Sequence, residues 1–582
     1  MITRLLIVVS VAVIISCQQG YRDIPEEEAA YNLSIRLGFE PDRINPILSR
    51  QVHASQIEGM IFLPLSDYNP FSLRLEPVLI KDYPKITAID PADEEKGLRY
   101  EMEIMEEATW DDGTPVTGYD YLFTMKVAQD PYLLNTTWKN QMAHITDVTV
   151  DPNNPKKITV LTNNKYILSE EVITNNDVYP EHIYDPDQLL KPYNFQQIKN
   201  IGSQADADLD STLHQFATQF NDEKYSREII SGNGPYEFEE WIPKQQIILK
   251  RKENWWGTKF QDKHPSLQAH PASITYHLIP DAQTALTSLK DQRLDLVADI
   301  TPEQFQELKN YNNQEHPLTL EAPDVLSYYF IAYNNDRPAL RDKRVRRAIS
   351  MLMDIENLID KLFYGLATRT IGPLSPNHPA YNHDVKPVPF DPQGALKLLA
   401  EAGWSDTNHD GILDKTIEGI KTNLSLSILT SRSQLSQDVA IILKSEAEKV
   451  GIQMSIIPND VPKLIQDTEN GDYDLSCLAS VQSIAAYDPT NFWHSEKAGP
   501  GGTNYFNFRN AEVDSLIDKI RITLNESERN ELYLKFQQIL QDEQPALFLV
   551  APKTPLAALK KLNFKTTTLR PGYFENTISI KN

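Results

Sequence analysis

The alternation of helix-like and strand-like segments in the second half of the chain is the feature that most constrains its fold. One apolar stripe has the spacing of a single helix face and ends before Gly451, and residues 452–457 then have the pattern of a strand. The stripe consists of Val439, Ile442, Leu443, Ala447 and Val450. Helices that lead into strands through short loops favour α/β domains with sheets covered by helices. The first half is richer in strands, so we expect a mixed α/β fold.

The length of 582 residues exceeds what one hydrophobic core supports, and it predicts about two to four domains. In the first half, residues 32–37 and 98–104 alternate in strand fashion, and residues 119–128 have a more helical pattern. Residues 185–222 are polar and weakly patterned. We therefore expect this last segment to be a surface insertion.

The balance of charge argues against a nucleic-acid partner. Acidic residues outnumber basic ones by 81 to 56, giving a net charge of −25, whereas binding to phosphate backbones needs clustered Lys and Arg. A surface of this kind is typical of a soluble protein without a charged partner. An anionic ligand would need a local basic site.

The N-terminus has the pattern of an export signal. Arg4 precedes an apolar stretch at 5–15, which is shorter than the ~20 residues of a membrane-spanning helix. Ile-Ile-Ser-Cys at 14–17 resembles a bacterial lipobox, in which Cys17 is acylated and becomes the mature N-terminus. The alternative is an ordinary cleaved signal with an incidental cysteine. We predict a signal peptide at 1–17, a flexible tether at 18–31, and an exported protein that is lipid-anchored to a membrane and faces the periplasm or cell exterior.

Cysteine usage limits the chemistry of the mature chain. Cys17 and Cys477 are the only cysteines, so lipidation of Cys17 leaves Cys477 without an intrachain partner. Neither a disulfide framework nor a cysteine-based metal site is then possible. Cys477 lies in an apolar, strand-like stretch, which favours an inert core thiol.

Four blocks of sequence carry a family resemblance. The first is Gly-Asn-Gly-Pro-Tyr-Glu-Phe at 232–238, running on to Arg-Lys-Glu-Asn-Trp-Trp-Gly at 251–257. The second is Tyr-Phe-Ile-Ala-Tyr-Asn-Asn at 329–335 with the basic stretch 340–349. Trp-Asp-Asp-Gly at 110–113 with Pro-Val-Thr at 115–117, and Asp-Pro-Thr-Asn-Phe-Trp at 488–493, complete the set. In their order and spacing they resemble family 5 of the extracellular solute-binding proteins, the peptide- and nickel-type receptors of ABC importers.

The resemblance implies a two-lobed periplasmic-binding-protein type II fold with a two-strand hinge and an extra strand-rich insertion domain. The first lobe would combine a discontinuous domain, formed by 32–64, 190–324 and 550–582, with the insertion domain at 65–189. The second lobe would be an α/β domain at 325–549. Such a protein captures a ligand between its lobes and delivers it to a membrane permease, so we expect a monomer with a small peptide or other small solute as ligand.

The resemblance leaves the ligand and the class of partner open. A metal chelate, haem or an oligosaccharide would fit the same scaffold, and the chain could instead be a ligand sensor for a membrane signalling partner. No nucleophile elbow, zinc-protease motif or phosphate-binding Gly-rich loop is present in the sequence. We therefore expect no enzyme activity and no cofactor.

The resemblance also suggests ligand contacts. In peptide-binding members an Asp shortly before the Pro-Thr stretch pairs with the α-ammonium of the ligand, but Ala485 occupies the aligned position here. Asp488 is the nearest replacement, or it is a turn residue before Pro489. The remaining candidates are Tyr487, Trp493 and Tyr505 as aromatic walls, Asn504 as a hydrogen-bonding group, and Trp110 and Tyr328 from the opposing lobe and the inter-lobe strands.

Two motifs point weakly to metals. Residues 406–414 resemble the start of a calcium loop, but Ile417 stands where an EF-hand needs a bidentate Glu. His264, His270 and His277 have no zinc spacing. His494 is retained as a metal or haem-ligand candidate, but the lack of partner ligands in the sequence favours a solvated imidazole. We predict no metal site, and leave calcium at 406–414 open.

Overall fold

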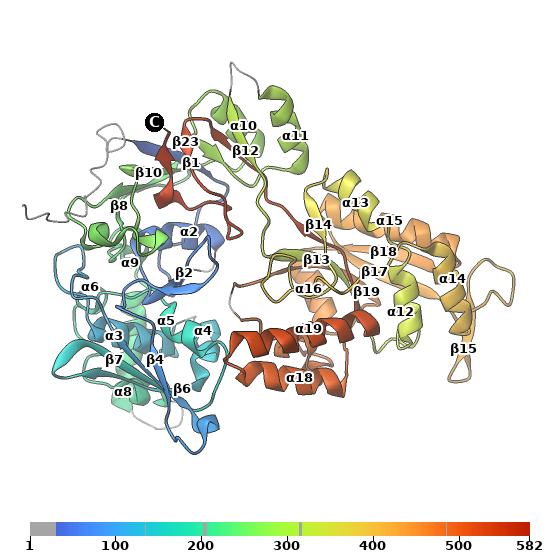
Figure 1. The fold of residues 1–582 in the computed structure, drawn as a ribbon, viewed down its shortest axis with the longest axis horizontal. Coiled ribbons are helices and arrows are strands. Elements are labelled where there is room, and N and C mark those ends of the chain that lie inside the picture. The colour runs from blue at the N-terminus through green and yellow to red at the C-terminus, as the bar shows by residue number, and fades with distance from the viewer. Residues whose placement is uncertain are drawn as a thin grey trace, which may run out of the picture.

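The computed structural model describes residues 31–49, 51–133, 136–201, 207–312, 317–484 and 486–581. The predicted signal peptide, the lipidation site Cys17, nearly all of the predicted tether and the aligned position Ala485 lie outside these residues. The chain forms two lobes, one on each side of the molecule in Figure 1. Among the described residues, no helix is long and apolar enough to cross a bilayer.

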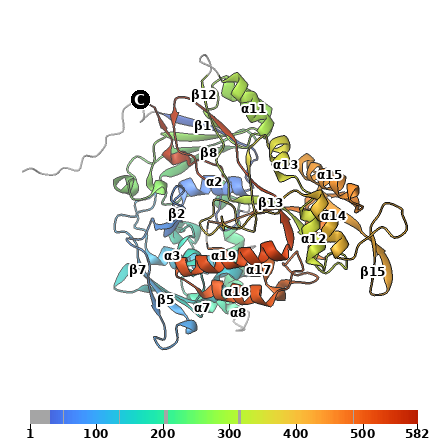
Figure 2. The same cartoon turned by 45° about the vertical axis from the view of Figure 1, so that its right-hand side comes forward.

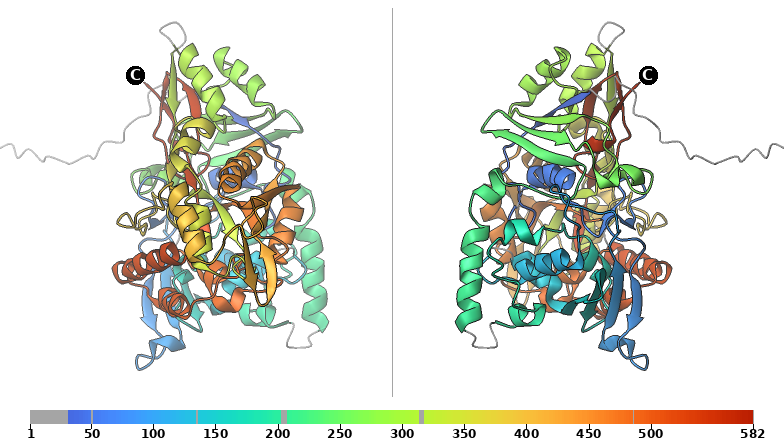
Figure 3. Two further views of the ribbon diagram at one scale, coloured as in Figure 1. Left: turned by 90° about the vertical axis from the view of Figure 1, so that its right-hand side faces the viewer. Right: turned by 90° about the vertical axis from the view of Figure 1, so that its left-hand side faces the viewer.

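A seven-stranded sheet forms the body of the first lobe, and its strands come from distant parts of the chain. Its order is β12-β22-β11-β1-β10-β9-β8, and Figure 3 shows its blue, green and red strands together at one end of the molecule. The bounds are β1 Asn32–Leu37, β8 Tyr236–Ile242, β9 Gln246–Arg251, β10 Ser273–Leu278, β11 Leu296–Val297, β12 Leu318–Glu321 and β22 Leu556–Leu559. The predicted strand at 32–37 is therefore confirmed, at the centre of this sheet.

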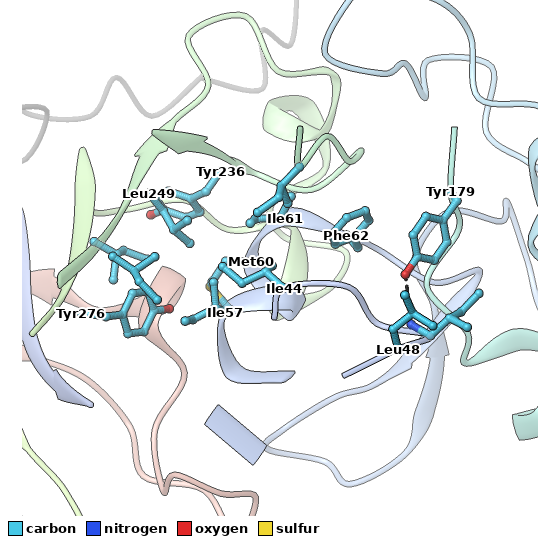
Figure 4. Packing of buried hydrophobic residues seen from close by; sticks show 14 of the residues in the cluster. Ile44, Leu48, Ile57, Met60, Ile61, Phe62, Tyr179, Tyr236, Leu249 and Tyr276 are labelled. Carbon is cyan, nitrogen blue, oxygen red and sulfur yellow. Dashed lines mark hydrogen bonds between the residues drawn. The ribbon is translucent and has the colours of Figure 1, made fainter. Parts of the chain in front are cut away.

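Helix α2 (Val52–Ile61) packs beneath this sheet. Figure 4 shows Ile57, Met60 and Ile61 of α2 directed towards the strand residues Tyr236 and Tyr276. The Gly-Asn-Gly-Pro block contacts the end of this helix, because the Gly234 amide donates to the Ile61 carbonyl oxygen at 2.7 Å. A Cβ on Gly234 would also lie 2.7 Å from that oxygen. This close approach explains why the turn at 232–235 needs glycine.

The insertion domain contributes a four-stranded antiparallel sheet to the first lobe. Its order is β4-β5-β7-β6, with bounds β4 Lys85–Ala88, β5 Leu98–Glu103, β6 Ile145–Asp151 and β7 Asn154–Thr162. Helix α3 (Gly118–Gln129) covers this sheet and starts with a capping box between Thr117 and Asp120. The sequence predicted this helix at 119–128.

A five-stranded mixed sheet forms the core of the second lobe. Its order is β18-β17-β19-β13-β20, with bounds β13 Ser327–Tyr333, β17 Ser425–Ser431, β18 Gln453–Asn459, β19 Leu475–Val481 and β20 Ala546–Phe548. The helices around it are α12 Lys343–Ser350, α13 Ile355–Leu362, α14 Pro392–Glu401, α15 Gln434–Lys449, α16 Val461–Glu469, α18 Ala511–Ile522 and α19 Glu526–Glu543. The predicted apolar stripe lies on α15, and the strand after Gly451 is β18. The mixed α/β expectation is thus confirmed.

Two chain segments connect the lobes and lie side by side. One leads from β12 to β13, and the other leads from β21 (Val550–Pro552) to β22. Asp324 and Lys553 pair across them with an ion pair of 3.6 Å, and the Thr554 amide donates to the Pro323 carbonyl oxygen at 2.9 Å. A paired crossing of this kind lets two rigid bodies rotate about a few backbone torsions.

The expectation of a surface insertion at 185–222 is wrong. This segment contains α7 (Phe195–Lys199) and α8 (Ala207–Phe220). The buried residues of α8 are Leu209, Leu213, Phe216, Ala217 and Phe220, and they belong to the main core of the first lobe. These apolar residues form one face of the helix and pack against the core, whereas the polar residues between them make the segment look hydrophilic on average.

Candidate ligand-binding cleft

Asp488 lies in the loop before α17 (Thr490–Trp493) and has several donors around its carboxylate. Oδ1 accepts hydrogen bonds from the amide and the hydroxyl of Thr490, at 3.0 and 2.5 Å. Oδ2 accepts from the Tyr166 hydroxyl at 2.9 Å and from Nε of Arg521 at 3.2 Å. Asp488 is therefore both the residue that closes the turn before α17 and the negative partner of an ion pair.

These partners make Asp488 part of a contact between the lobes. Tyr166 follows β7 in the insertion domain, whereas Arg521 lies in the last turn of α18 in the second lobe. A backbone bond joins the same two segments, because the Ile167 amide donates to the Arg521 carbonyl oxygen at 2.9 Å. Figures 1 and 2 place α18 and α19 beside the insertion domain.

Trp493 and Tyr487 pack against the core of the second lobe. The Trp493 side chain is 1% exposed and stacks on the Phe506 ring, with a centroid distance of 4.2 Å and an angle of 9°. Its Nε1 donates to the Tyr487 hydroxyl at 2.9 Å. The Tyr533 hydroxyl donates in turn to the Tyr487 carbonyl oxygen. These contacts fix the loop that carries Asp488, and they leave little of the Trp493 ring for a ligand.

Asn504 and Tyr505 lie in the loop that follows. Asn504 is buried, and its Nδ2 donates to the carbonyl oxygens of His494 and Phe508 at 3.2 and 2.9 Å. Tyr505 is half-buried, meets the Phe492 ring edge-on, and directs its hydroxyl to Glu469 at 3.4 Å. Of the predicted aromatic walls, Tyr487 and Tyr505 keep accessible surface.

Tyr328 and Trp110 belong to different cores. Tyr328 lies on β13 in the same second-lobe cluster as Trp493 and packs against the rings of Phe330 and Phe548. Trp110 is buried in the core of the insertion domain. The structure thus brings six of the seven predicted residues together in the second lobe, and it places Trp110 elsewhere.

A largely apolar cavity of about 390 Å³ opens at one edge of the second-lobe sheet. It lies where β17 leads into α15, where β18 leads into α16, and beside the paired strands β13 and β19. Its lining includes Tyr329, Phe330, Val461, Leu464, Cys477 and Ala479, with hydroxyls from Ser431, Ser433 and Ser436. Burial raises the pKa of the Cys477 thiol to about 12, which keeps it protonated. An apolar wall with a few hydroxyls is typical of small-ligand sites.

A second cavity of about 610 Å³ lies in the first lobe, and its lining is more polar. It is lined by the start of α2, the loop after β1, Asp299 and the C-terminal segment around Arg570. Phe39 and Val52 line it with 69% and 60% of their surfaces exposed. Exposed apolar side chains beside charged ones indicate a surface that contacts something else.

Both cavities adjoin the hinge, because Leu549 and Val550 at the start of one hinge segment line the second-lobe cavity and Arg570 beside the other segment lines the first-lobe cavity. Burial raises the pKa of Tyr329, which lines the second-lobe cavity, and the positive charge of Arg570 in the first-lobe cavity opposes that shift. The turn after Arg570 also lies against the hinge, since a Cβ on Gly572 would be 3.1 Å from Cγ of Pro323. The cavities are therefore the candidate walls of one inter-lobe site.

No motif in the sequence pointed to the first-lobe wall. Phe39, Asp299 and Arg570 come from three distant parts of the chain, and none of them lies in a family block. Only the folded sheet brings them together.

Among the described residues, no group of three or more His, Cys, Asp or Glu side chains could hold a metal ion. In the loop 406–414, Asp406 accepts the amides of Asp410 and Gly411, and Asp414 pairs with Lys421 at 3.3 Å. His494 accepts the Glu496 amide with Nδ1 and lies 3.7 Å from Asp518. These side chains serve local folding of their loops.

Comparison with known proteins identifies the family. The model of the bacterial extracellular solute-binding proteins, family 5, matches residues 74–502, which is more than half of the chain. The chain belongs to this family. The oligopeptide-binding protein AppA of Bacillus subtilis is 24% identical over 531 residues, covering 90% of this chain and 86% of AppA.

Solved structures agree with the fold. The structure of Bacillus subtilis AppA in complex with a nonapeptide superposes with a TM-score of 0.65 at 22% identity, covering 95% of this chain and 99% of that one. NikA from Brucella suis in complex with Fe(III)-EDTA superposes with a TM-score of 0.72 at 19% identity, covering 94% and 100%. The two-lobed fold of this family therefore accommodates chemically different ligands.

Proposed function

We propose that this chain is the extracytoplasmic receptor of an ABC importer and that it captures peptide-like ligands between its two lobes. The observation that supports this most directly is the pair of cavities beside the hinge, one apolar with serine hydroxyls and one charged. A peptide combines apolar side chains with a polar backbone and charged ends, so it matches both walls. The similarity to an oligopeptide-binding protein over most of the chain also supports a peptide.

The proposed mechanism involves no bond cleavage. A ligand that contacts both walls favours the conformation in which the lobes are closest, because only that conformation offers all of its contacts. The closed receptor then docks on the membrane permease and releases its ligand there. Main-chain hydrogen bonding, charge pairing and the removal of water supply the affinity.

Native mass spectrometry of the protein purified from its own host tests this proposal. A heterogeneous set of short peptides, released on denaturation, is the expected result. A single non-peptide mass would replace the peptide with that compound and keep the receptor role. Protein isolated without ligand is then challenged with a casein digest, and failure to retain any peptide would contradict a peptide ligand.

The same digest tests the proposal that the protein is not an enzyme. Peptides recovered after prolonged incubation are expected to keep their original masses. New cleavage products that depend on the folded protein would contradict the receptor role as the whole of its function.

A further inference from the structure

The first-lobe cavity contains two side chains of opposite charge that are free to pair with a ligand. Asp299 and Arg570 both line it and are exposed, and neither side chain has a hydrogen bond or an ion pair with any other residue in the described part of the chain. The other carboxylates of this wall are engaged. Glu40 accepts from Nε1 of Trp241 at 2.9 Å, and Glu575 accepts from the Gln56 amide group.

The backbone holds Asp299 so that its side chain faces away from the core. Its neighbours Ala298 and Ile300 are both buried, and the Ala298 carbonyl oxygen accepts from Nη1 of Arg36 at 3.3 Å. Asp299 itself has a φ of 54°, in the left-handed region. Asp and Asn adopt that region more readily than most other non-glycine residues. The positive charge of Arg36 interacts electrostatically with Asp299, but the Arg36 guanidinium donates its hydrogen bonds to three backbone carbonyl oxygens.

Arg570 is presented by a tight turn at the hinge end of the cavity. The Gly572 amide donates to the Leu569 carbonyl oxygen at 2.7 Å, which places Arg570 at the second position of the turn. Gly572 has a φ of 101°, which only glycine adopts readily. The Thr567 amide donates to the Gly572 carbonyl oxygen at 3.0 Å and so fixes the end of the turn.

Lobe closure would remove water from the two charged side chains, and each would then need a partner of opposite charge. An ion that loses its water without gaining a partner is strongly disfavoured. Asp299 and Arg570 lie on the same lobe, so rotation of the lobes does not bring them together. A ligand of one sign would leave the other residue unpaired, whereas a zwitterion satisfies both.

We propose that Arg570 binds an anionic group, and Asp299 a cationic group, of one zwitterionic ligand. This inference rests on the proposed receptor function and assigns charge recognition to the first lobe. It moves the cation site away from Asp488, whose carboxylate is already held by Arg521 and Tyr166. The exposed Phe39 and Val52 and the apolar second-lobe cavity contact the uncharged parts of the ligand.

Calorimetry with matched peptides tests the assignment on the full chain. Peptides retained by the wild-type protein from a casein digest are resynthesised with free ends, with an N-acetyl group, and with a C-terminal amide. Arg570→Ala is expected to weaken binding of the free-acid peptide by about tenfold or more, and binding of the C-terminal amide by less than about threefold. Asp299→Asn is expected to weaken binding of the peptide with a free amine by about tenfold or more, and binding of the N-acetylated peptide by less than about threefold.

Matched variants separate charge recognition from general effects. Arg341→Ala and Asp262→Asn remove the same charges from exposed positions outside the cavity and should leave all affinities unchanged. Arg570→Lys, which keeps the charge, should recover part of the loss. If the wild-type protein binds blocked and free peptides equally, or if Arg570→Ala weakens all forms alike, the assignment is wrong while the receptor function stands. If no peptide is retained at all, the assignment and the proposed peptide ligand are both wrong.

Discussion

The Tyr166 hydroxyl of the insertion domain donates to Oδ2 of Asp488 in the second lobe at 2.9 Å. The same oxygen accepts from Arg521, whose guanidinium lies 5.5 Å from the centre of the Tyr166 ring. One carboxylate thus joins the two lobes at a point separate from the hinge. A contact of this kind stabilises the conformation in which it forms and disfavours any conformation that breaks it.

Tyr166→Phe is expected to loosen this contact. The variant loses only the hydroxyl, and a hydrogen bond to a charged group contributes about 1.5–3 kcal/mol. Spin labels on Cys introduced at the exposed positions Thr149 and Lys519 should show a longer mean distance in the ligand-free variant. Tyr132→Phe is the matched control, because the Tyr132 hydroxyl donates to Asp210 at 2.7 Å within the first lobe. Identical distance distributions in all three proteins would contradict a role in lobe spacing.

Asp488→Asn should reduce affinity for a cationic ligand less than Asp299→Asn does. The Asp488 carboxylate already pairs with a cation of the protein, whereas Asp299 forms no ion pair with any residue that the structure describes. The loss of the Arg521 pair should cost stability by about 1 kcal/mol or less, because Arg521 is 41% exposed. Titration of both variants with one free-amine peptide compares them directly. A larger loss for Asp488→Asn would restore Asp488 as the cation site.

Local periodicity explains which parts of the fold the sequence could predict. The stripe on α15 and the strand β18 after Gly451 appear in a short window, and both are observed. The family block at 488–493 likewise placed Asp488 and Trp493 close together, with Tyr487 next to them. The direction of each side chain could not be read, because an aromatic residue packs equally well in a core or in a binding wall. The stacking of Trp493 on Phe506 depends on a loop that the pattern does not describe.

Long-range contacts account for what the sequence left out. The first-lobe wall joins Phe39, Asp299 and Arg570, which only the seven-stranded sheet brings together. The error at 185–222 has a different cause. Leu209, Leu213, Phe216 and Phe220 follow a helical spacing, but polar neighbours lowered the average hydropathy of the segment. The spacing of these apolar residues, unlike the composition of the segment, predicts α8.

Stability should fall as the pH rises from about 5 to about 9, and Glu58→Gln should reduce that fall. Burial raises the pKa of Glu58 to about 8, although the Asn45 amide and the Ser49 hydroxyl both donate to it. The folded protein therefore holds a proton that the unfolded chain releases, so this contribution is complete below the unfolded pKa and is lost as the pH rises through about 8. Glutamine stays neutral throughout.

Thermal unfolding midpoints measured across this pH range check the Glu58 prediction. Burial also raises the pKa values of Glu171 and Asp177 to about 7. These carboxyls should therefore preserve part of the dependence of the unfolding midpoint on pH in the variant. Glu303→Gln, at an exposed position of α11 (Pro302–Tyr311), serves as the control. Parallel curves for wild type and Glu58→Gln would show that Glu58 does not titrate differently on unfolding.

Cys17→Ser should release the protein from the membrane. Acyl chains on Cys17 would hold it there, since each buried methylene contributes about 0.8 kcal/mol. The wild-type protein should incorporate radiolabelled palmitate and sediment with membranes, and the variant should do neither. Cys477→Ser is the control, because this buried cysteine lies in the second-lobe core. Label that persists in Cys17→Ser would contradict lipidation at this position.

Ala479→Trp should block the second-lobe cavity without unfolding the lobe. Ala479 lines the cavity from β19 and is exposed, so a larger side chain would extend into the space of about 390 Å³ instead of the core. Peptide affinity by calorimetry is expected to fall by about tenfold or more, because the apolar anchor loses its pocket. The thermal midpoint should stay close to that of the wild type. Ala511→Trp, exposed at the start of α18, should bind normally. Unchanged affinity in Ala479→Trp would show that the ligand does not use this cavity, and Ala479→Leu provides the same test if the tryptophan variant unfolds.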